Sequence, residues 1–203
     1  MCVILEEEGG DFAERVPVPP PNFATVEDNS VYRSGFPQPS NFSFLQSLHL
    51  KSILCLCTEP YPEGNLEFLK SNNIKLFQFG IDGTKEPTSI PRSTITEALE
   101  VLIDVRNHPI LIHCRSGKHR TGCLVGSLRI LQNWRLSSVV EEYKRYAGAK
   151  SRLTDLAFLE KYDASSLRHC LQNLLYQYQG YGSRKRRLLY KEELVQKPRI
   201  TSA

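Results

Sequence analysis

Short apolar runs alternate with segments of helical periodicity along this chain, and the alternation restricts the fold more than any other feature. Residues 52–57 and 109–112 are nearly continuous apolar stretches, and residues 74–79 alternate apolar with polar side chains, as strands do. Apolar residues at helical spacing occupy three further segments: residues 64–72, 93–106 and 121–133. Strands that alternate with helices predict an α/β fold with a central, mostly parallel sheet of four to five strands flanked by helices.

The length of 203 residues fits one domain with tails. Residues 1–21 combine acidic residues, glycines and prolines without periodicity, so we expect a flexible N-terminal arm. The folded domain is predicted to span residues 22–180, followed by a basic tail over residues 181–203. The basic run 184–187 is typical of a solvated segment, with nuclear import or lipid binding as alternatives.

Features of membrane and secreted proteins do not occur in the sequence. No apolar run approaches the roughly 18–20 residues that a transmembrane helix needs. Glu6, Glu7 and Glu8 stand where a signal peptide would be apolar. The six cysteines form no paired CxxC motif for zinc, and Cys55 and Cys57 are expected on one face of a buried strand. We therefore expect a reducing compartment, the cytoplasm, with the nucleus as a second location.

The net charge of +4 is unevenly distributed. Residues 1–30 contain seven acidic residues and one arginine, so the rest of the chain carries an excess of ten positive charges. This excess of positive charge favours an anionic ligand. Charge alone leaves nucleic acid, phosphoinositides and small polyphosphates open.

Residues 112–122 have the clearest chemical meaning. They read Ile-His-Cys-Arg-Ser-Gly-Lys-His-Arg-Thr-Gly and connect the apolar strand to an apolar helix. Such a loop can direct successive backbone N–H groups at an anion, and the N-terminus of the helix adds positive potential. These effects and the charge of Arg120 favour a thiolate at Cys114, which would act as a nucleophile at neutral pH.

The neighbours of Cys114 suit phosphate chemistry. Arg120 offers a planar fork for two phosphoryl oxygens, and Gly117 permits the backbone angles of a tight loop. The Thr121 hydroxyl is expected to stabilise the departing thiolate, and His113 to orient the loop from beneath. Zinc binding by His113 and Cys114 is the alternative, but two adjacent residues make a poor four-ligand site.

The pattern His-Cys-(x)5-Arg-Thr at residues 113–121 resembles the signature of the cysteine-dependent phosphatases. Four segments resemble the plant and fungal atypical dual-specificity phosphatases: residues 31–37, 79–87, 107–114 and 117–126. Their shared order extends the resemblance over roughly residues 22–180. The chain departs from the family at Ser116. Members commonly have a basic residue directly before the glycine that corresponds to Gly117, whereas here the basic residue, Arg115, comes one position earlier.

The resemblance implies a compact dual-specificity-phosphatase fold and phosphate removal through a phosphocysteine intermediate, with no metal or other cofactor. Members of the family act on inositol pyrophosphates and remove the β-phosphate at the 5-position; some are described as protein tyrosine phosphatases. The expected partner is therefore an inositol pyrophosphate, with a phosphoprotein as the alternative, and not a nucleic acid. No feature of the sequence indicates an oligomeric state.

Phosphatases of this class normally need a general acid, and Asp82, which precedes Cys114 by 32 residues, is the first candidate. A turn role beside Gly83 is the alternative for Asp82, and Glu86 is a second candidate for the acid. A pyrophosphate substrate has a phosphate as leaving group, which needs less protonation. Lys85 is then expected to neutralise that phosphate.

Basic residues are expected to surround the mouth of the site and bind substrate together with Ser116 and Gly117: Arg115, Lys118, His119, Lys150 and Arg152. A polyphosphorylated inositol suits such a mouth, whereas a phosphotyrosine needs a deep aromatic slot. Simple solvent exposure is the alternative for Lys118 and His119, and an ordinary polar helix end for Lys150 and Arg152.

Two further functions use similar residues. A sulfurtransferase also places a cysteine in an anion-binding loop, but the string from Gly117 to Gly122 argues against it. A phosphate-binding scaffold with decayed catalysis is the alternative of another class. Against it stand Cys114, Arg120, Thr121 and Asp82, which are all present.

Overall fold

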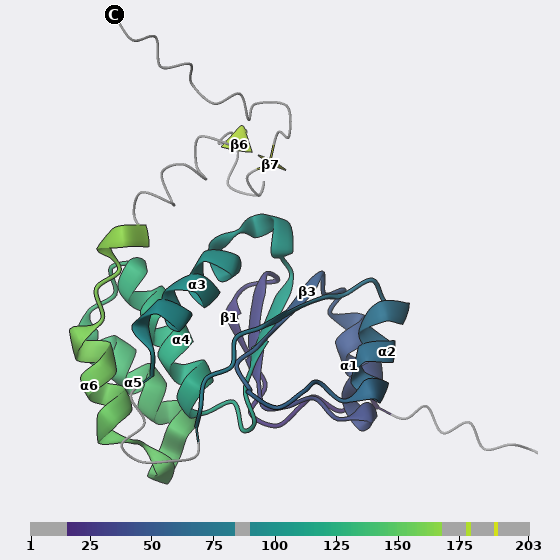
Figure 1. Cartoon of the computed structure of the whole chain (residues 1–203), viewed down its shortest axis with the longest axis horizontal. Helices are drawn as coiled ribbons and strands as arrows, with labels where there is room; N and C mark the ends of the chain where they lie inside the picture. Colours follow the sequence, from purple (N-terminus) through teal and green to yellow (C-terminus); the bar gives the residue numbers. More distant parts are fainter. Residues whose placement is uncertain (1–15, 84–89, 168–177, 180–188, 191–203) are drawn as a thin grey trace, which may run out of the picture.

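A five-stranded sheet in the order β1-β2-β5-β3-β4 organises the protein (Figure 1). The computed structural model describes residues 16–83, 90–167, 178–179 and 189–190. The strands of the sheet are β1 (Ala24–Glu27), β2 (Val31–Ser34), β3 (Ser52–Cys55), β4 (Lys75–Gln78) and β5 (Ile110–His113). Because β1 is antiparallel to β2 and the other three pairs are parallel, the predicted mostly parallel sheet is confirmed.

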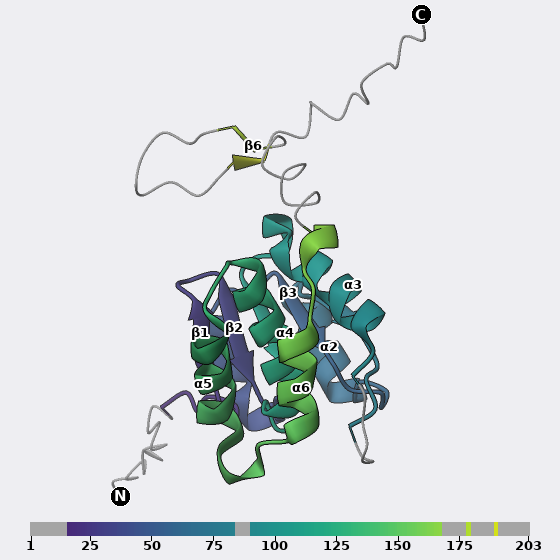
Figure 2. The ribbon, with the colours of Figure 1, turned by 90° about the vertical axis from the view of Figure 1, so that its left-hand side faces the viewer.

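Helices cover both faces of this sheet. One layer holds α1 (Phe42–Ser47) and α2 (Glu63–Ser71). The larger layer holds α3 (Arg92–Ile103), α4 (His119–Leu131), α5 (Leu136–Ala147) and α6 (Leu153–Lys161). Figure 2 looks onto the larger layer, where α5 and α6 lie in front of α4.

Shorter elements complete the described residues. Three 3-10 helices connect the main elements: η1 (Pro39–Asn41), η2 (Val105–Asn107) and η3 (Gly148–Lys150). Strands β6 (Tyr178–Gln179) and β7 (Leu189–Tyr190) pair antiparallel with each other. No helix in the described ranges combines the length and apolar character that a membrane crossing requires.

The centre of the fold is the pair β5 and α4. All four residues of β5 are buried between β2 and β3, as expected for the apolar run 109–112. Gly122 and Gly126 let two other helices approach α4 closely. A Cβ at Gly122 would lie 2.8 Å from Cδ2 of Tyr143, and one at Gly126 would lie 2.5 Å from Cδ2 of Leu159. Both glycines therefore serve close packing between helices.

The boundaries of the predicted helices differ from the structure by up to three residues. The helix expected over residues 121–133 begins at His119, because the positive φ of Gly117 completes the turn of the loop two residues earlier. The helix expected over residues 93–106 ends at Ile103, because the Asp104 side chain accepts a hydrogen bond from the Arg106 N–H at 3.0 Å and begins η2 instead.

Part of the segment assigned to the flexible arm lies against the domain. The Asn41 amide donates to the carbonyls of Val18 and Pro19 at 3.1 and 3.3 Å, and Pro20 is buried. The N–H of Gly35 donates to the Pro21 carbonyl at 2.6 Å. The ordered domain therefore includes residues 18–21. Residues 1–15 and the basic run 184–187 lie outside the described residues.

Candidate active site

The segment from Cys114 to Lys118 connects the end of β5 to the start of α4, and we call it the phosphate loop. It lies at the carboxyl ends of three parallel strands, β2, β5 and β3, where open α/β sheets bind ligands. Cys114 is 2 % exposed and is a free thiol. The sequence-based position of the nucleophile at a strand end beneath a helix N-terminus therefore agrees with the structure.

Hydrogen bonds from outside the loop hold the carbonyls of residues 115–117. The Phe36 N–H donates to the Arg115 carbonyl at 3.1 Å. The Asn22 amide donates to the carbonyls of Ser116 and Gly117 at 3.5 and 3.2 Å. Arg33 also donates to the Gly117 carbonyl, at 2.8 Å. A trans peptide places its N–H opposite its C=O. The N–H groups of residues 116–118 therefore point into the loop, where they form a site for an oxyanion.

Gly117 is required at its position for two reasons. Its φ is +69°, a conformation that residues with a side chain rarely adopt. In addition, a Cβ would lie 2.5 Å from both the carbonyl carbon and the oxygen of Ser34, and 2.6 Å from the nitrogen of Gly35. The loop therefore packs directly on the backbone of β2, which explains the glycine that the sequence analysis associates with a tight turn.

The Arg120 guanidinium is fixed by backbone at the rim of the loop. Its Nη1 donates to the carbonyls of Leu56 at 3.1 Å and Ile81 at 2.9 Å, so it bridges the segments that follow β3 and β4. Gly83 lies against it, since a Cβ there would lie 3.0 Å from Nε and Cζ. Because both bonds use Nη1, the Nε and Nη2 edge is left to grip two oxygens of an oxyanion.

Asp82 lies between the two residues that contact Arg120. The carbonyl of Ile81 and the Cα of Gly83 both face the guanidinium, and the Asp82 side chain is exposed. Arg152 holds the same segment from the other side, with Nη1 and Nη2 each 3.4 Å from the Gly83 carbonyl oxygen. The predicted acid and one predicted substrate-binding arginine thus lie beside Arg120. Lys85 and Glu86 lie outside the described residues.

Thr121 and His113, two further residues of the motif, are both buried. Thr121 is fully buried, and its hydroxyl has no hydrogen-bond partner among the described residues, so the hydroxyl remains available to a group in the site. The ring of His113 is fully buried, and its Nε2 shares a hydrogen bond of 3.1 Å with the Tyr61 hydroxyl. Phe36 packs edge-on against the same ring at a centroid distance of 4.9 Å. This enclosed position suits the orienting role predicted for His113.

Burial lowers the pKa of His113 to about 3. The unfolded chain takes up a proton on this ring as the pH falls below about 6.5, whereas the folded protein does not. Folding stability is therefore lost as the pH falls from 6.5 toward 3. Between pH 7 and pH 5, this group should reduce the free energy of unfolding by about 2 kcal/mol.

Urea titrations of the wild type and of His113→Gln at pH 7 and pH 5 measure this loss. The variant is less stable at pH 7 because it loses the Tyr61 bond, but its stability should depend less on pH by that amount. An equal pH dependence in both proteins would mean that His113 accepts a proton in the folded state.

The outer basic residues differ in their environments. Arg115 and Lys150 are exposed, as is Ser116, whereas Lys118 and His119 are half-buried. The Nε2 of His119 donates to the Lys150 carbonyl at 2.6 Å and ties η3 to the start of α4. The ring of His119 is therefore held by a backbone carbonyl, and its predicted contact with substrate stays a prediction.

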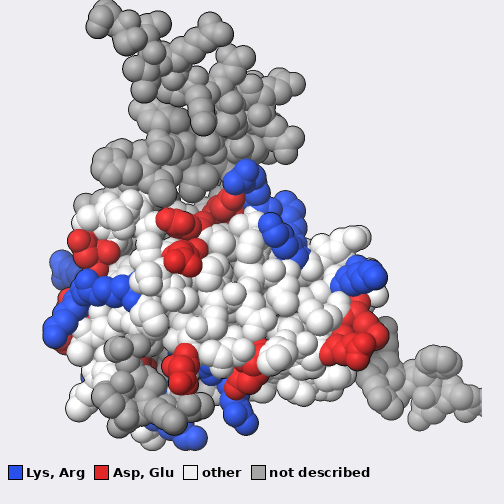
Figure 3. Space-filling view, viewed as in Figure 1, with Lys and Arg blue, Asp and Glu red and all other residues white. Residues whose placement is uncertain are grey.

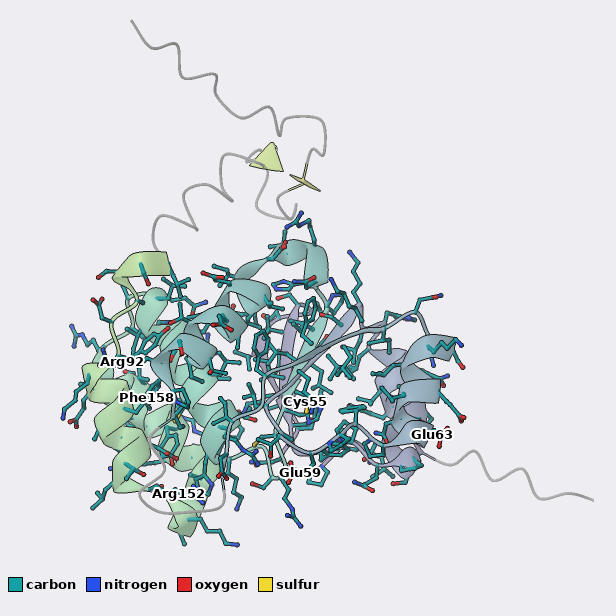
Figure 4. The ribbon with its side chains drawn as sticks, viewed as in Figure 1. Cys55, Glu59, Glu63, Arg92, Arg152 and Phe158 are labelled. Carbon is teal, nitrogen blue, oxygen red and sulfur yellow. The ribbon has the colours of Figure 1, made fainter. Side chains whose placement is uncertain are left out.

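Glu59 is an acidic residue of the site that the sequence analysis missed. It follows β3, and its carbonyl accepts a hydrogen bond from Gln78 at 2.7 Å. The pKa of Glu59 is lowered, first by hydrogen bonding to its own backbone N–H and further by the charges of Arg120 and Arg115. Figure 4 places Glu59 at the lower edge of the molecule, and Figure 3 shows both signs of charge along that edge. In the sequence, the available signal for Glu59 was an acidic residue shortly after the apolar run 52–57.

Replacing Glu59 with glutamine should increase the affinity for a polyphosphate. The carboxylate opposes the field of Arg120 and Arg115, so its loss should lower KM roughly two- to fivefold at low ionic strength. The effect should fade at high salt because the site is exposed. Glu63→Gln on α2 removes the same charge from an exposed position in another part of the molecule (Figure 4) and is the control. Equal KM values for the two variants would contradict the expectation.

Cys55 and Cys57 share one face, as predicted, and lie beside His113. The two sulfur atoms and a ring nitrogen of His113 lie within 4.8 Å of one another, all buried. This set of soft donors is the one place among the described residues where a metal ion could be held. Cys114 is not part of the set.

Taken together, the parallel sheet, the loop of inward N–H groups, the enclosed thiol and the fixed arginine define a cysteine-dependent phosphatase. A family model described as "Tyrosine phosphatase family" matches residues 17–179. The chain belongs to this family.

Several known proteins are similar to this chain in sequence as well as in fold. "Inositol diphosphatase DSP3" of Arabidopsis thaliana is 59 % identical, over 100 % of this chain and 99 % of its own length. "Inositol diphosphatase SIW14" of Saccharomyces cerevisiae is 51 % identical, over 74 % of this chain and 54 % of its own length. The crystal structure of the core catalytic domain of the PP-IP phosphatase SIW14, in complex with citrate, superposes with a TM-score of 0.74 at 47 % identity, over 78 % and 95 % of the two chains. The family predicted from the motifs is thereby confirmed.

Proposed function

We propose that this phosphatase hydrolyses inositol pyrophosphates and releases the β-phosphate at the 5-position. The observation that carries the proposal is the charge around the phosphate loop. Arg115 and Lys118 both belong to the phosphate loop, whereas Arg152 lies before α6 and bonds the segment that holds Asp82. Cations on several sides suit a substrate that carries phosphate in every direction. The names of the relatives support the same substrate class.

The reaction follows from the groups in place. The Cys114 thiolate attacks the β-phosphorus, the P–O bond to the bridging oxygen breaks, and the electron pair leaves with the remaining inositol phosphate. The N–H groups of residues 116–118 and the Arg120 guanidinium hold the three oxygens of the transferred group. Water then attacks the phosphocysteine, the S–P bond breaks, and inorganic phosphate and the thiolate are released. Thr121 is assigned to stabilise that thiolate, and Asp82 to exchange the protons.

A side-by-side turnover assay tests the substrate. The purified protein is given 5-diphosphoinositol pentakisphosphate, inositol hexakisphosphate and a phosphotyrosine peptide, with Cys114→Ser as the control. Release of one phosphate from the first substrate alone supports the proposal. Preference for the peptide would instead assign the protein to tyrosine dephosphorylation. Orthovanadate should inhibit in either case, because it occupies the same oxyanion site.

Asp82→Asn separates two modes of leaving-group departure. An aryl ester with a basic leaving group needs a proton, so its turnover should fall roughly 10²-fold or more. The leaving group of a pyrophosphate is far less basic, so its turnover should fall much less. Comparing kcat on the two substrates measures the difference. An unchanged rate on the basic aryl ester would exclude Asp82 as the acid.

A further inference from the structure

Arg33, on β2, is a buried cation with no part in the reaction described above. Its side chain is 0 % exposed. Its Nη2 donates to the Gly117 carbonyl at 2.8 Å, and its Cζ lies 3.7 Å from the centroid of the Tyr146 ring on α5. The guanidinium is therefore enclosed between the phosphate loop and the larger helical layer.

Within the described residues, no carboxylate forms an ion pair with Arg33, and its Nε and Nη1 have no hydrogen-bond partner. Burial lowers the pKa of Arg33 to about 10, so it stays charged at neutral pH. Arg129 on α4 is different, because it bonds Glu27 and Glu142 at 2.5 and 3.0 Å. Enclosing an uncompensated charge is costly, and charged groups perturbed in this way cluster at functional sites.

The groups that face Arg33 show which anion this is. Tyr146 and Glu142 on α5, Arg129 on α4 and Cys114 on the loop all act on its charge. Glu142 is already paired with Arg129 at 3.0 Å, and Tyr146 contacts the guanidinium through the face of its ring. Cys114 and the phosphoryl group bound above it remain as the negative charges that Arg33 can balance.

We propose that Arg33 is a positioning residue of the phosphate loop and supplies the buried positive charge that favours the Cys114 thiolate and a bound oxyanion. Its Nη2 holds the Gly117 carbonyl outward, which turns the N–H of Lys118 inward. Its unpaired charge lies behind the loop, where water cannot screen it. The inference rests on the proposed phosphatase chemistry of Cys114, but it can be measured without turnover.

Two substitutions separate charge from position. Arg33→Gln keeps an amide donor and removes the charge, whereas Arg33→Lys keeps the charge and removes the planar group that spans Tyr146 and Gly117. The first readout is the pH dependence of Cys114 alkylation by iodoacetamide. It is followed by mass spectrometry on the tryptic peptide 107–115, which contains no other cysteine. The second readout is the affinity for orthovanadate. Arg129→Lys, at a buried arginine paired with Glu27 and Glu142, keeps the neutralising charge and controls for a merely structural effect.

For Arg33→Gln, the midpoint of the alkylation profile should rise by about one pH unit, and vanadate affinity should fall roughly tenfold. The midpoint should stay near the wild-type value in Arg33→Lys and Arg129→Lys, while Arg33→Lys should still bind vanadate several-fold more weakly. If Arg33→Gln does not fold, the vanadate affinity of Arg33→Lys still tests whether the planar group of Arg33 positions the phosphate loop. Profiles and affinities within twofold of wild type in both Arg33 variants would make Arg33 a packing residue. Absent turnover in the wild type would contradict the proposed function alone, because neither readout depends on it.

Discussion

Replacing Cys114 with serine is expected to abolish turnover while substrate binding persists. Serine keeps the size of the residue and the N–H groups of residues 116–118, so the oxyanion site survives. A serine hydroxyl is not ionised at neutral pH, so the attack on phosphorus is lost, and turnover should fall by roughly 10⁴-fold or more. Phosphate release measures the first effect, and calorimetric titration with 5-diphosphoinositol pentakisphosphate measures the second.

Cys123→Ser is the matched control for this substitution. Cys123 is also buried, on α4, but it takes no part in the loop. Its replacement should leave turnover intact and affect stability alone. Turnover that survives in Cys114→Ser would assign the nucleophile to another residue, and lost binding would mean that the substitution had disturbed the loop itself.

Gly117→Ala is expected to have the largest effect among substitutions that remove no reacting group. The methyl group would meet the backbone of Ser34 at 2.5 Å, and φ of +69° would add strain. The loop must shift away from β2, and a shift of about 1 Å in a catalytic group costs roughly 10²-fold in rate. Strain and overpacking together should lower the free energy of unfolding by about 2–5 kcal/mol. Turnover and urea denaturation measure the two effects.

Gly148→Ala separates the two causes. Gly148 also has a positive φ, +58°, but a Cβ there would meet no atom within 4 Å. Alanine at this position should cost about 1–3 kcal/mol from strain, with turnover close to that of the wild type. If Gly148→Ala lost as much activity as Gly117→Ala, general destabilisation and not the contact with Ser34 would be the cause.

The local part of the site could be predicted because it is continuous in sequence. An apolar strand, a polar loop and a glycine-containing helix follow one another between residues 109 and 133, so the positions of Cys114 and Arg120 follow from periodicity and spacing. Arg152 bonds the Gly83 carbonyl next to Asp82, and its contact with substrate stays a prediction. The start of α4 was misplaced because periodicity cannot detect the turn that Gly117 completes.

The residues that hold the loop could not be predicted in the same way. Arg33 reaches Gly117 because β2 pairs with β5, a contact across 84 positions of sequence. Asn22 bonds the loop, and Glu59 lies within the field of Arg115 and Arg120, because the sheet brings distant segments together. No local sequence pattern indicates such partners. A charged residue within the short strand 31–34 was a visible exception to strand composition, but its meaning depended on the neighbours that the sheet supplies.

The hydrogen bonds from the N-terminal segment have a practical consequence for trimming the protein. The Pro21 carbonyl accepts the Gly35 N–H, and the Asn22 amide donates to loop carbonyls and to the Tyr146 carbonyl at 3.4 Å. This segment therefore connects β2, the phosphate loop and α5. A protease that cuts after residue 22 would remove these hydrogen bonds, although the chain from Cys114 to Arg120 would remain intact. The shortest fully active fragment should therefore begin before Val18, well upstream of the first catalytic motif.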